Sequence, residues 1–112
     1  MPSPSLMIQY FDGCPSWQLM EQRVREAMTA LDIDPDGLEL QEIRSSAQAE
    51  ADRFHGSPSL LVNGIDAFAA ADATVGMACR LYRVPSGLSG SPTREEIRSA
   101  IAAAVRSATS GD

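Results

Sequence analysis

The sequence of 112 residues contains no lysine, two cysteines and one histidine. All nine basic residues are arginine, and fifteen acidic residues give a formal net charge of -6. An acidic chain without a basic cluster lacks the electrostatic footprint of a protein that binds nucleic acid or an anionic membrane. Two cysteines are too few for a disulfide framework or a cysteine-based zinc site, and the single His55 adds little. We therefore expect no nucleic-acid or membrane partner, no metal and no cofactor.

Long apolar runs are also missing. No segment approaches the ~20 apolar residues that span a bilayer, and the N-terminal MPSPSLMIQYFDG has neither the basic nor the apolar region of a secretory signal. We therefore expect a cytoplasmic location, in which both thiols rest in the reduced state. The hydrophobic content of 44% supplies one core. A single domain over 1–112 follows, as a monomer with disordered ends at 1–5 and 108–112.

The hydrophobic pattern predicts strands and helices in the order βαβαββα. Residues 6–11 are almost continuously apolar, as in a central strand, whereas residues 38–43 alternate, as in a half-exposed strand. Helical periodicity covers 15–31 and, after Ser45 or Ser46 as a cap, about 46–54. Two further strands are predicted at 57–62 and 79–84, separated by a small-residue loop. Thr93 and Glu96 form a capping box that starts the last helix.

The stretch FDGCPSW joins the first predicted strand to the first predicted helix. Asp12-Gly13 is a turn signal, and Pro15 suits the first helical position, which makes Cys14 the N-cap. A helix N-terminus presents unpaired N–H groups and about half a positive charge. Such a site lowers the pKa of a cysteine from about 8.5 and so favours the thiolate, which is the nucleophile. Cys14 is therefore the candidate reactive residue.

The element order, Cys14 at the first strand-to-helix junction and Pro58 at the start of the third strand resemble the thioredoxin fold over residues 6–105. The resemblance implies an α/β protein with a mixed four-stranded sheet and three helices. It also implies a cis-proline at Pro58 that faces Cys14, with the backbone of Ser57 turned toward an extended peptide or disulfide substrate. The segments GCPSW, GSPSLLVNG and CRLYR are similar to those of small thioredoxin-like proteins, some of which are labelled alkylmercury lyase.

The sequence departs from the Cys-x-x-Cys motif because Trp17 stands where the second cysteine would be. A dithiol cycle within the motif is therefore excluded. Cys14 then acts alone with a small resolving thiol, pairs with Cys79, or is catalytically silent. In the predicted topology Cys79 begins a strand whose other end approaches Cys14, on the order of 20 Å away at ~3.3 Å per residue, and a disulfide needs Cα atoms within ~7 Å. Unless the loop over residues 65–78 folds back and moves the start of this strand, we therefore expect Cys79 to be a separate, small buried hydrophobe.

The working hypothesis is a thiol-dependent oxidoreductase with Cys14 as its nucleophile. Ser57, Pro58 and Trp17 would contact a thiol or disulfide substrate, either a protein or a small thiol; Trp17 is alternatively part of the apolar helix face, which its spacing favours. Two rival hypotheses remain. One is an organomercurial-lyase-like or mercury- or metal-thiolate protein that uses Cys14 with Cys79. The other is a non-catalytic binding module on the same scaffold.

Other polar residues near the predicted site have a structural interpretation beside the functional one. His55 is either a base for Cys14 or a last-turn helix residue beside Gly56, where the helix dipole favours it. Asp66 and Asp72 either bind a cation or are solvated loop residues. Asp12 is either an acid beside Cys14 or part of the turn. In each case the pattern favours the structural interpretation.

Overall fold

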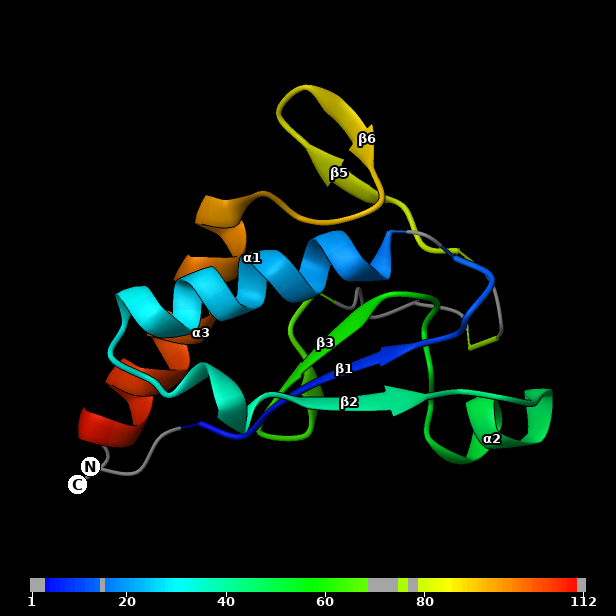
Figure 1. Cartoon of the computed structure of the whole chain (residues 1–112), viewed down its shortest axis with the longest axis horizontal. Coiled ribbons are helices and arrows are strands. Elements are labelled where there is room, and N and C mark those ends of the chain that lie inside the picture. Colours follow the sequence, from blue (N-terminus) through cyan, green and yellow to red (C-terminus); the bar gives the residue numbers. More distant parts are fainter. Residues whose placement is uncertain (1–3, 15, 69–74, 77–78, 111–112) are drawn as a thin grey trace.

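A mixed four-stranded sheet lies at the centre of the computed structural model, which describes residues 4–14, 16–68, 75–76 and 79–110 (Figure 1). The elements follow one another as β1 (Leu6–Tyr10), α1 (Trp17–Ala30), the 3₁₀ helix η1 (Pro35–Gly37), β2 (Glu39–Glu42), α2 (Ser46–Ala51), β3 (Ser59–Val62), β4 (Ile65–Asp66), β5 (Tyr82–Val84), β6 (Gly87–Ser89) and α3 (Arg94–Ser110).

The sheet has the order β2-β1-β3-β4. Strand β1 pairs in parallel with β2, to which it is connected through α1, and antiparallel with β3 on its other side. Strand β4 completes the sheet antiparallel to β3. The predicted α/β class, with a mixed four-stranded sheet and three α-helices, is therefore confirmed.

The fourth strand of this sheet is not the predicted segment 79–84. Asn63 and Gly64 adopt positive φ angles of 54° and 81°, as a two-residue hairpin turn requires. The chain therefore reverses at once, and Val62 pairs with Ile65. Residues of the predicted strand instead form β5, which pairs with β6 in a separate two-stranded sheet. This hairpin projects beyond α1 in Figure 1, and its second strand, β6, follows the predicted segment 79–84 in the sequence.

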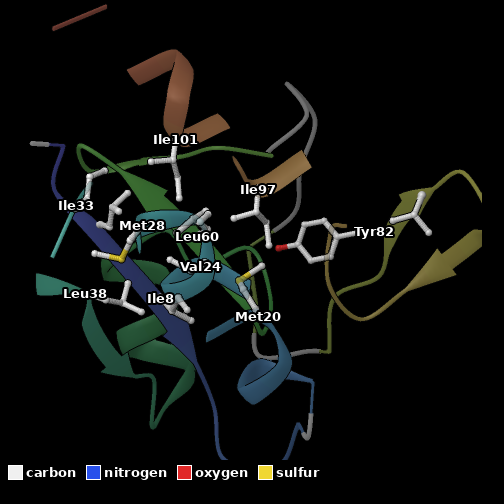
Figure 2. Packing of buried hydrophobic residues seen from close by; sticks show 13 residues of the cluster. Ile8, Met20, Val24, Met28, Ile33, Leu38, Leu60, Tyr82, Ile97 and Ile101 are labelled. Carbon is white, nitrogen blue, oxygen red and sulfur yellow. The ribbon is translucent and has the colours of Figure 1, made fainter. Parts of the chain in front are cut away.

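The main core lies between the sheet and the helices α1 and α3, which pack against each other (Figure 2). Its side chains come from alternate positions of β1 and β3 and from steps of three and four along the helices, as the periodicity predicts. Fully buried members are Ile8, Met20, Val24, Leu60, Ile97 and Ile101. Burial of each such side chain contributes roughly 1.5–3 kcal/mol. A second, smaller cluster of Ile43, Ala49 and Phe54 packs α2 onto the segments that flank it.

The helix caps follow the sequence signals closely. The Ser45 hydroxyl accepts a hydrogen bond from the Gln48 amide (3.1 Å) at the start of α2. Thr93 and Glu96 form the predicted capping box, since each side chain accepts from the other's backbone N–H at 3.1 and 2.9 Å. Helix α3 continues to Ser110, beyond the predicted disordered boundary at 108, and residues 1–3 and 111–112 lie outside the described part of the chain.

The N-terminal segment is also tied to the sheet, although residues 1–5 were expected to be disordered. The Ser5 amide donates to the Asn63 side chain at 2.9 Å, and the Asn63 amide donates back to the Ser5 carbonyl at 2.8 Å. Among the described residues, no helix is both long and apolar enough to cross a bilayer.

Candidate functional site

Cys14 lies in the connection between β1 and α1, where it is almost inaccessible, with 2% of its surface exposed. Its amide donates to the Phe11 carbonyl at 3.3 Å, which closes the predicted turn through Asp12 and Gly13. Helix α1 begins only at Trp17, with Ser16 as the N-cap. The prediction that Cys14 is the N-cap is therefore wrong, because the turn ends at Cys14 and the first helical carbonyl is that of Ser16, which accepts from Met20. Pro15 lies outside the described residues.

Cys14 forms a disulfide with Cys79, and their Cα atoms are 5.9 Å apart. The expectation that these residues lie far apart is wrong, because it placed Cys79 in the strand that pairs with β3. Strand β4 takes that position, and Cys79 instead forms an isolated parallel bridge with Ser57. Cys79 is exposed rather than buried. The pair is thus in its oxidised state and joins a buried residue to an exposed one.

The peptide bond between Ser57 and Pro58 is cis, as the resemblance implies, and both residues are buried beside the disulfide. The Ser57 hydroxyl accepts from the Phe11 amide at 3.2 Å. Its carbonyl oxygen accepts from the Arg80 amide at 2.9 Å and lies 3.6 Å from Cys14 Sγ. A disulfide sulfur has no proton to donate, so this last approach becomes a hydrogen bond only when Cys14 is reduced. The backbone of Ser57 was expected to face a substrate, but its carbonyl already accepts a hydrogen bond from the protein's own Arg80 amide.

Arg80, next to the exposed cysteine, is fixed by Asp66 of β4. Its Nη1 lies 2.6 Å from Asp66 Oδ2 and donates to Ser59 Oγ at 3.0 Å. The Asp66 side chain is 6% exposed. Burial raises the pKa of Asp66, but hydrogen bonds from Arg80 and from the Phe68 amide lower it more, so that the pKa lies below its ordinary value. Asp66 is therefore not the solvated loop residue that the sequence favoured.

His55 also contacts Asp66, with Nδ1 3.0 Å from Oδ2. The interpretation of His55 as a last-turn helix residue is wrong, because α2 ends at Ala51. Its side-chain partner is Asp66 rather than Cys14, so the structure gives no support to the role of base. Asp72, the other candidate for cation binding, lies outside the described residues, and within them no group of three potential metal-ligating side chains is found.

Tyr82 holds the other end of the segment that begins at Cys79. Its hydroxyl donates to the Pro58 carbonyl, and its ring packs in the main core. Burial raises the pKa of Tyr82 well above its ordinary value, so the hydroxyl keeps its proton. The guanidinium carbon of Arg80 lies 4.6 Å from the centre of the same ring, a distance suited to a cation–π contact. Both anchoring residues lie in the segment CRLYR, but no local pattern marks their roles, because their partners are remote in the sequence.

Trp17 stacks on Tyr10, with ring centres 4.1 Å apart and planes at 20°. Both residues are half-buried, and Trp17 is not one of the fully buried core residues. The stacking explains why a large aromatic residue is accommodated where a Cys-x-x-Cys motif has its second cysteine. Its predicted contact with a substrate stays a prediction.

Comparisons with protein-family models, with curated proteins and with solved structures found no match for this chain. The function is therefore inferred from the residues of the site and their geometry. The structure brings together four predicted residues, namely Cys14, Cys79, Ser57 and Pro58.

Proposed function

We propose that this protein is a thioredoxin-like thiol–disulfide oxidoreductase whose redox pair is Cys14 and Cys79. The observation that carries the proposal is the disulfide between these residues, which has one buried and one exposed partner beside the cis peptide bond of Pro58. This assignment replaces the single-cysteine hypothesis, because a resolving thiol is present within the chain.

The arrangement of the sheet supports the thioredoxin-like part of the proposal. The mixed four-stranded sheet, with a parallel β1–β2 pair and an antiparallel β3–β4 pair, and the cis-proline just before β3 agree with the sheet and the proline that the resemblance implies. The chain between β4 and α3 carries Cys79 back to the site. It supplies the second cysteine that the motif around Trp17 lacks.

Thiol–disulfide exchange needs a disulfide that a thiolate can reach and a second sulfur that can close it again. The exposed Cys79 meets the first need, and the Cα separation of 5.9 Å meets the second without backbone movement. We further propose a cytoplasmic location, where disulfides are usually transient and serve catalysis or redox sensing. The substrate is then a protein or small-molecule thiol or disulfide.

The proposal is tested by the reduction of insulin disulfides with dithiothreitol as the electron donor. The wild type should raise the rate above that of dithiothreitol alone, and Cys14→Ser and Cys79→Ser should each remove on the order of nine-tenths of this increase, because a single cysteine cannot close the cycle. Ser99→Ala, on the exposed side of α3, serves as the control and should match the wild type. Full activity in Cys79→Ser would contradict a paired mechanism, and no increase with the wild type would contradict the function.

A second candidate is a protein that holds mercury or another soft metal ion between two thiolates. The proximity of Cys14 and Cys79 favours it, since the separation that had argued against this use is absent. Titration of the reduced protein with Hg²⁺ tests it. One equivalent should protect both thiols from alkylation in the wild type, whereas protection of only one thiol would exclude two-thiolate binding. Failure both to reduce insulin and to bind mercury would leave the non-catalytic binding module as the remaining hypothesis.

A further inference from the structure

We infer that Cys79 is the residue that exchanges with the substrate and that Cys14 is the resolving cysteine. The inference rests on the proposed redox function and deepens it. It reverses the roles that the sequence suggests, in which Cys14 is the nucleophile. The reversal follows from the unequal surroundings of the two residues.

The two cysteines differ in their accessibility to a substrate. An incoming thiolate must approach one sulfur from the side opposite the sulfur that leaves, so the attacked residue needs open space around it. Cys14 is 2% exposed and its Sγ lies against the Ser57 carbonyl. Cys79 is exposed. A substrate thiolate can therefore reach Cys79 and not Cys14.

The exchange steps balance with a thiol and a disulfide as co-reactants. A thiolate of the donor attacks Cys79 Sγ, the bond to Cys14 breaks, and Cys14 leaves with the electron pair and takes up a proton. A second donor thiolate attacks the donor sulfur bound to Cys79, which yields the donor disulfide and frees Cys79. In the opposite half of the cycle, Cys79 attacks a substrate disulfide and releases one substrate thiolate. Deprotonated Cys14 then attacks Cys79 Sγ, which restores the protein disulfide and releases the second substrate thiolate.

The reduced Cys14 has a partner ready in its present position. The Ser57 carbonyl, 3.6 Å from Cys14 Sγ, can accept a hydrogen bond from the thiol. The backbone of Cys14 is also fixed, because its amide donates a hydrogen bond to the Phe11 carbonyl. The resolving thiol is thus held in place while the mixed disulfide exists.

The position of Cys79 does not depend on the disulfide alone. The side chain of the neighbouring Arg80 forms an ion pair with Asp66, and its amide donates a hydrogen bond to the Ser57 carbonyl. The Tyr82 hydroxyl donates a hydrogen bond to the Pro58 carbonyl. None of these contacts is made by a cysteine sulfur, so none of them requires the disulfide. They keep the substrate-bearing Cys79 within reach of Cys14, so the mixed disulfide can be resolved within the chain.

Competitive alkylation of the reduced wild type tests directly which of the two cysteines reacts first. The two cysteines fall in different tryptic peptides, residues 1–23 and 54–80. With a limiting amount of iodoacetamide, Cys79 should be labelled on the order of ten times faster than Cys14, because access controls the rate. The same labelling in strong denaturant is the control and should remove most of the difference. Equal labelling in the folded protein, or faster labelling of Cys14, would overturn the inference.

Adduct formation with glutathione disulfide gives a second measurement that needs no selective label. Reduced Cys14→Ser should form a stable mixed disulfide at Cys79, detected by intact mass. Reduced Cys79→Ser should form its adduct on the order of tenfold more slowly, because its thiol is buried. Circular dichroism first verifies that both variants are folded, and the alkylation result on the wild type stands if either is not. A faster adduct in Cys79→Ser would overturn the assignment.

Failure of this inference is distinguishable from failure of the proposed function. If the wild type reduces insulin but Cys14 is modified first, the redox pair stands and only the assignment of roles is wrong. If Cys79 is modified first but insulin is not reduced, the order of reactivity stands and the proposed catalysis is wrong.

Discussion

Arg80 and Asp66 form an ion pair at 2.6 Å that fixes the residue after Cys79 to the edge strand of the sheet. The side chains are 12% and 6% exposed, so the pair is largely shielded from water. A third group, His55, lies 3.0 Å from the same carboxylate. The chain next to the exposed residue Cys79 is therefore anchored by a largely buried ion pair as well as by the disulfide.

Replacement of Asp66 by Asn should destabilise the oxidised protein by about 3 kcal/mol, because it leaves a shielded guanidinium without its counter-charge. Urea unfolding measures the free energy. The matched control is Glu42→Gln, which removes the partner of Arg44 in a pair where the arginine side chain is 78% exposed. That change should cost less than about 1 kcal/mol. Similar losses in the two variants would show that the Arg80–Asp66 pair has no special role.

The contribution of the Asp66 carboxylate to the free energy of unfolding should disappear in acid. Burial raises the pKa of Asp66 in the folded protein, but the hydrogen bonds from Arg80 and from the Phe68 amide together outweigh burial, so the pKa lies below its ordinary value. The stabilisation is therefore fully present above the pKa of the unfolded chain, about 3.9, and is lost as the pH falls through the lower folded value. His55 also faces Asp66, so both proteins compared should carry His55→Gln.

The measurement is the difference in free energy of unfolding between that background and its Asp66→Asn derivative. It should be constant between about pH 7 and about pH 5 and shrink below about pH 4. A difference that increases as the pH falls would contradict the sign of the pKa shift. A difference that is independent of pH would show that the loss in Asp66→Asn does not arise from charge.

Reduction of the disulfide should lower the free energy of unfolding of the wild type. The bond joins residues 65 positions apart, and the loop entropy of a bridge of this size corresponds to about 4 kcal/mol. Urea unfolding with and without a phosphine reductant measures the change. Cys79→Ser, which cannot form the bond, should unfold at the same urea concentration under both conditions. A wild type that does not respond to the reductant would show that its native state gains no stability from this bond.

Much of the fold was predictable because its signals are local. The capping box of Thr93 and Glu96 and the cap at Ser45 lie within one helical turn, and the Asn63-Gly64 turn specifies its own hairpin. The strand that follows this turn was missed because β4 has only two residues, Ile65 and Asp66. So short a strand shows no periodicity, whereas the longer segment 79–84 does.

The site was only partly predictable, because the position of Cys79 depends on how the chain returns from β4. Cys14 and Pro58 were identified from their positions at element boundaries, which the sequence marks. The pairing of Cys14 with Cys79 follows from the path after β4, and no local pattern encodes that path. The anchors of this path, Arg80 on Asp66 and Tyr82 on Pro58, join residues that are 14 and 24 positions apart. Their partners could not be assigned before the position of β4 was known.

Tyr82→Phe tests whether the second anchor, the hydrogen bond from Tyr82 to the Pro58 carbonyl, matters for the proposed redox site. Loss of the hydroxyl leaves the buried Pro58 carbonyl without this donor and should cost about 1–2 kcal/mol in urea unfolding. The ring is retained, so the core contacts remain. The control is Tyr10→Phe, which keeps the stack on Trp17, and no hydrogen bond of the Tyr10 hydroxyl is seen among the described residues.

Because the anchor keeps Cys79 near Cys14, the glutathione adduct of reduced Tyr82→Phe should be resolved more slowly than that of Tyr10→Phe. Equal rates of resolution in the two variants would show that Arg80 and Asp66 suffice to position Cys79.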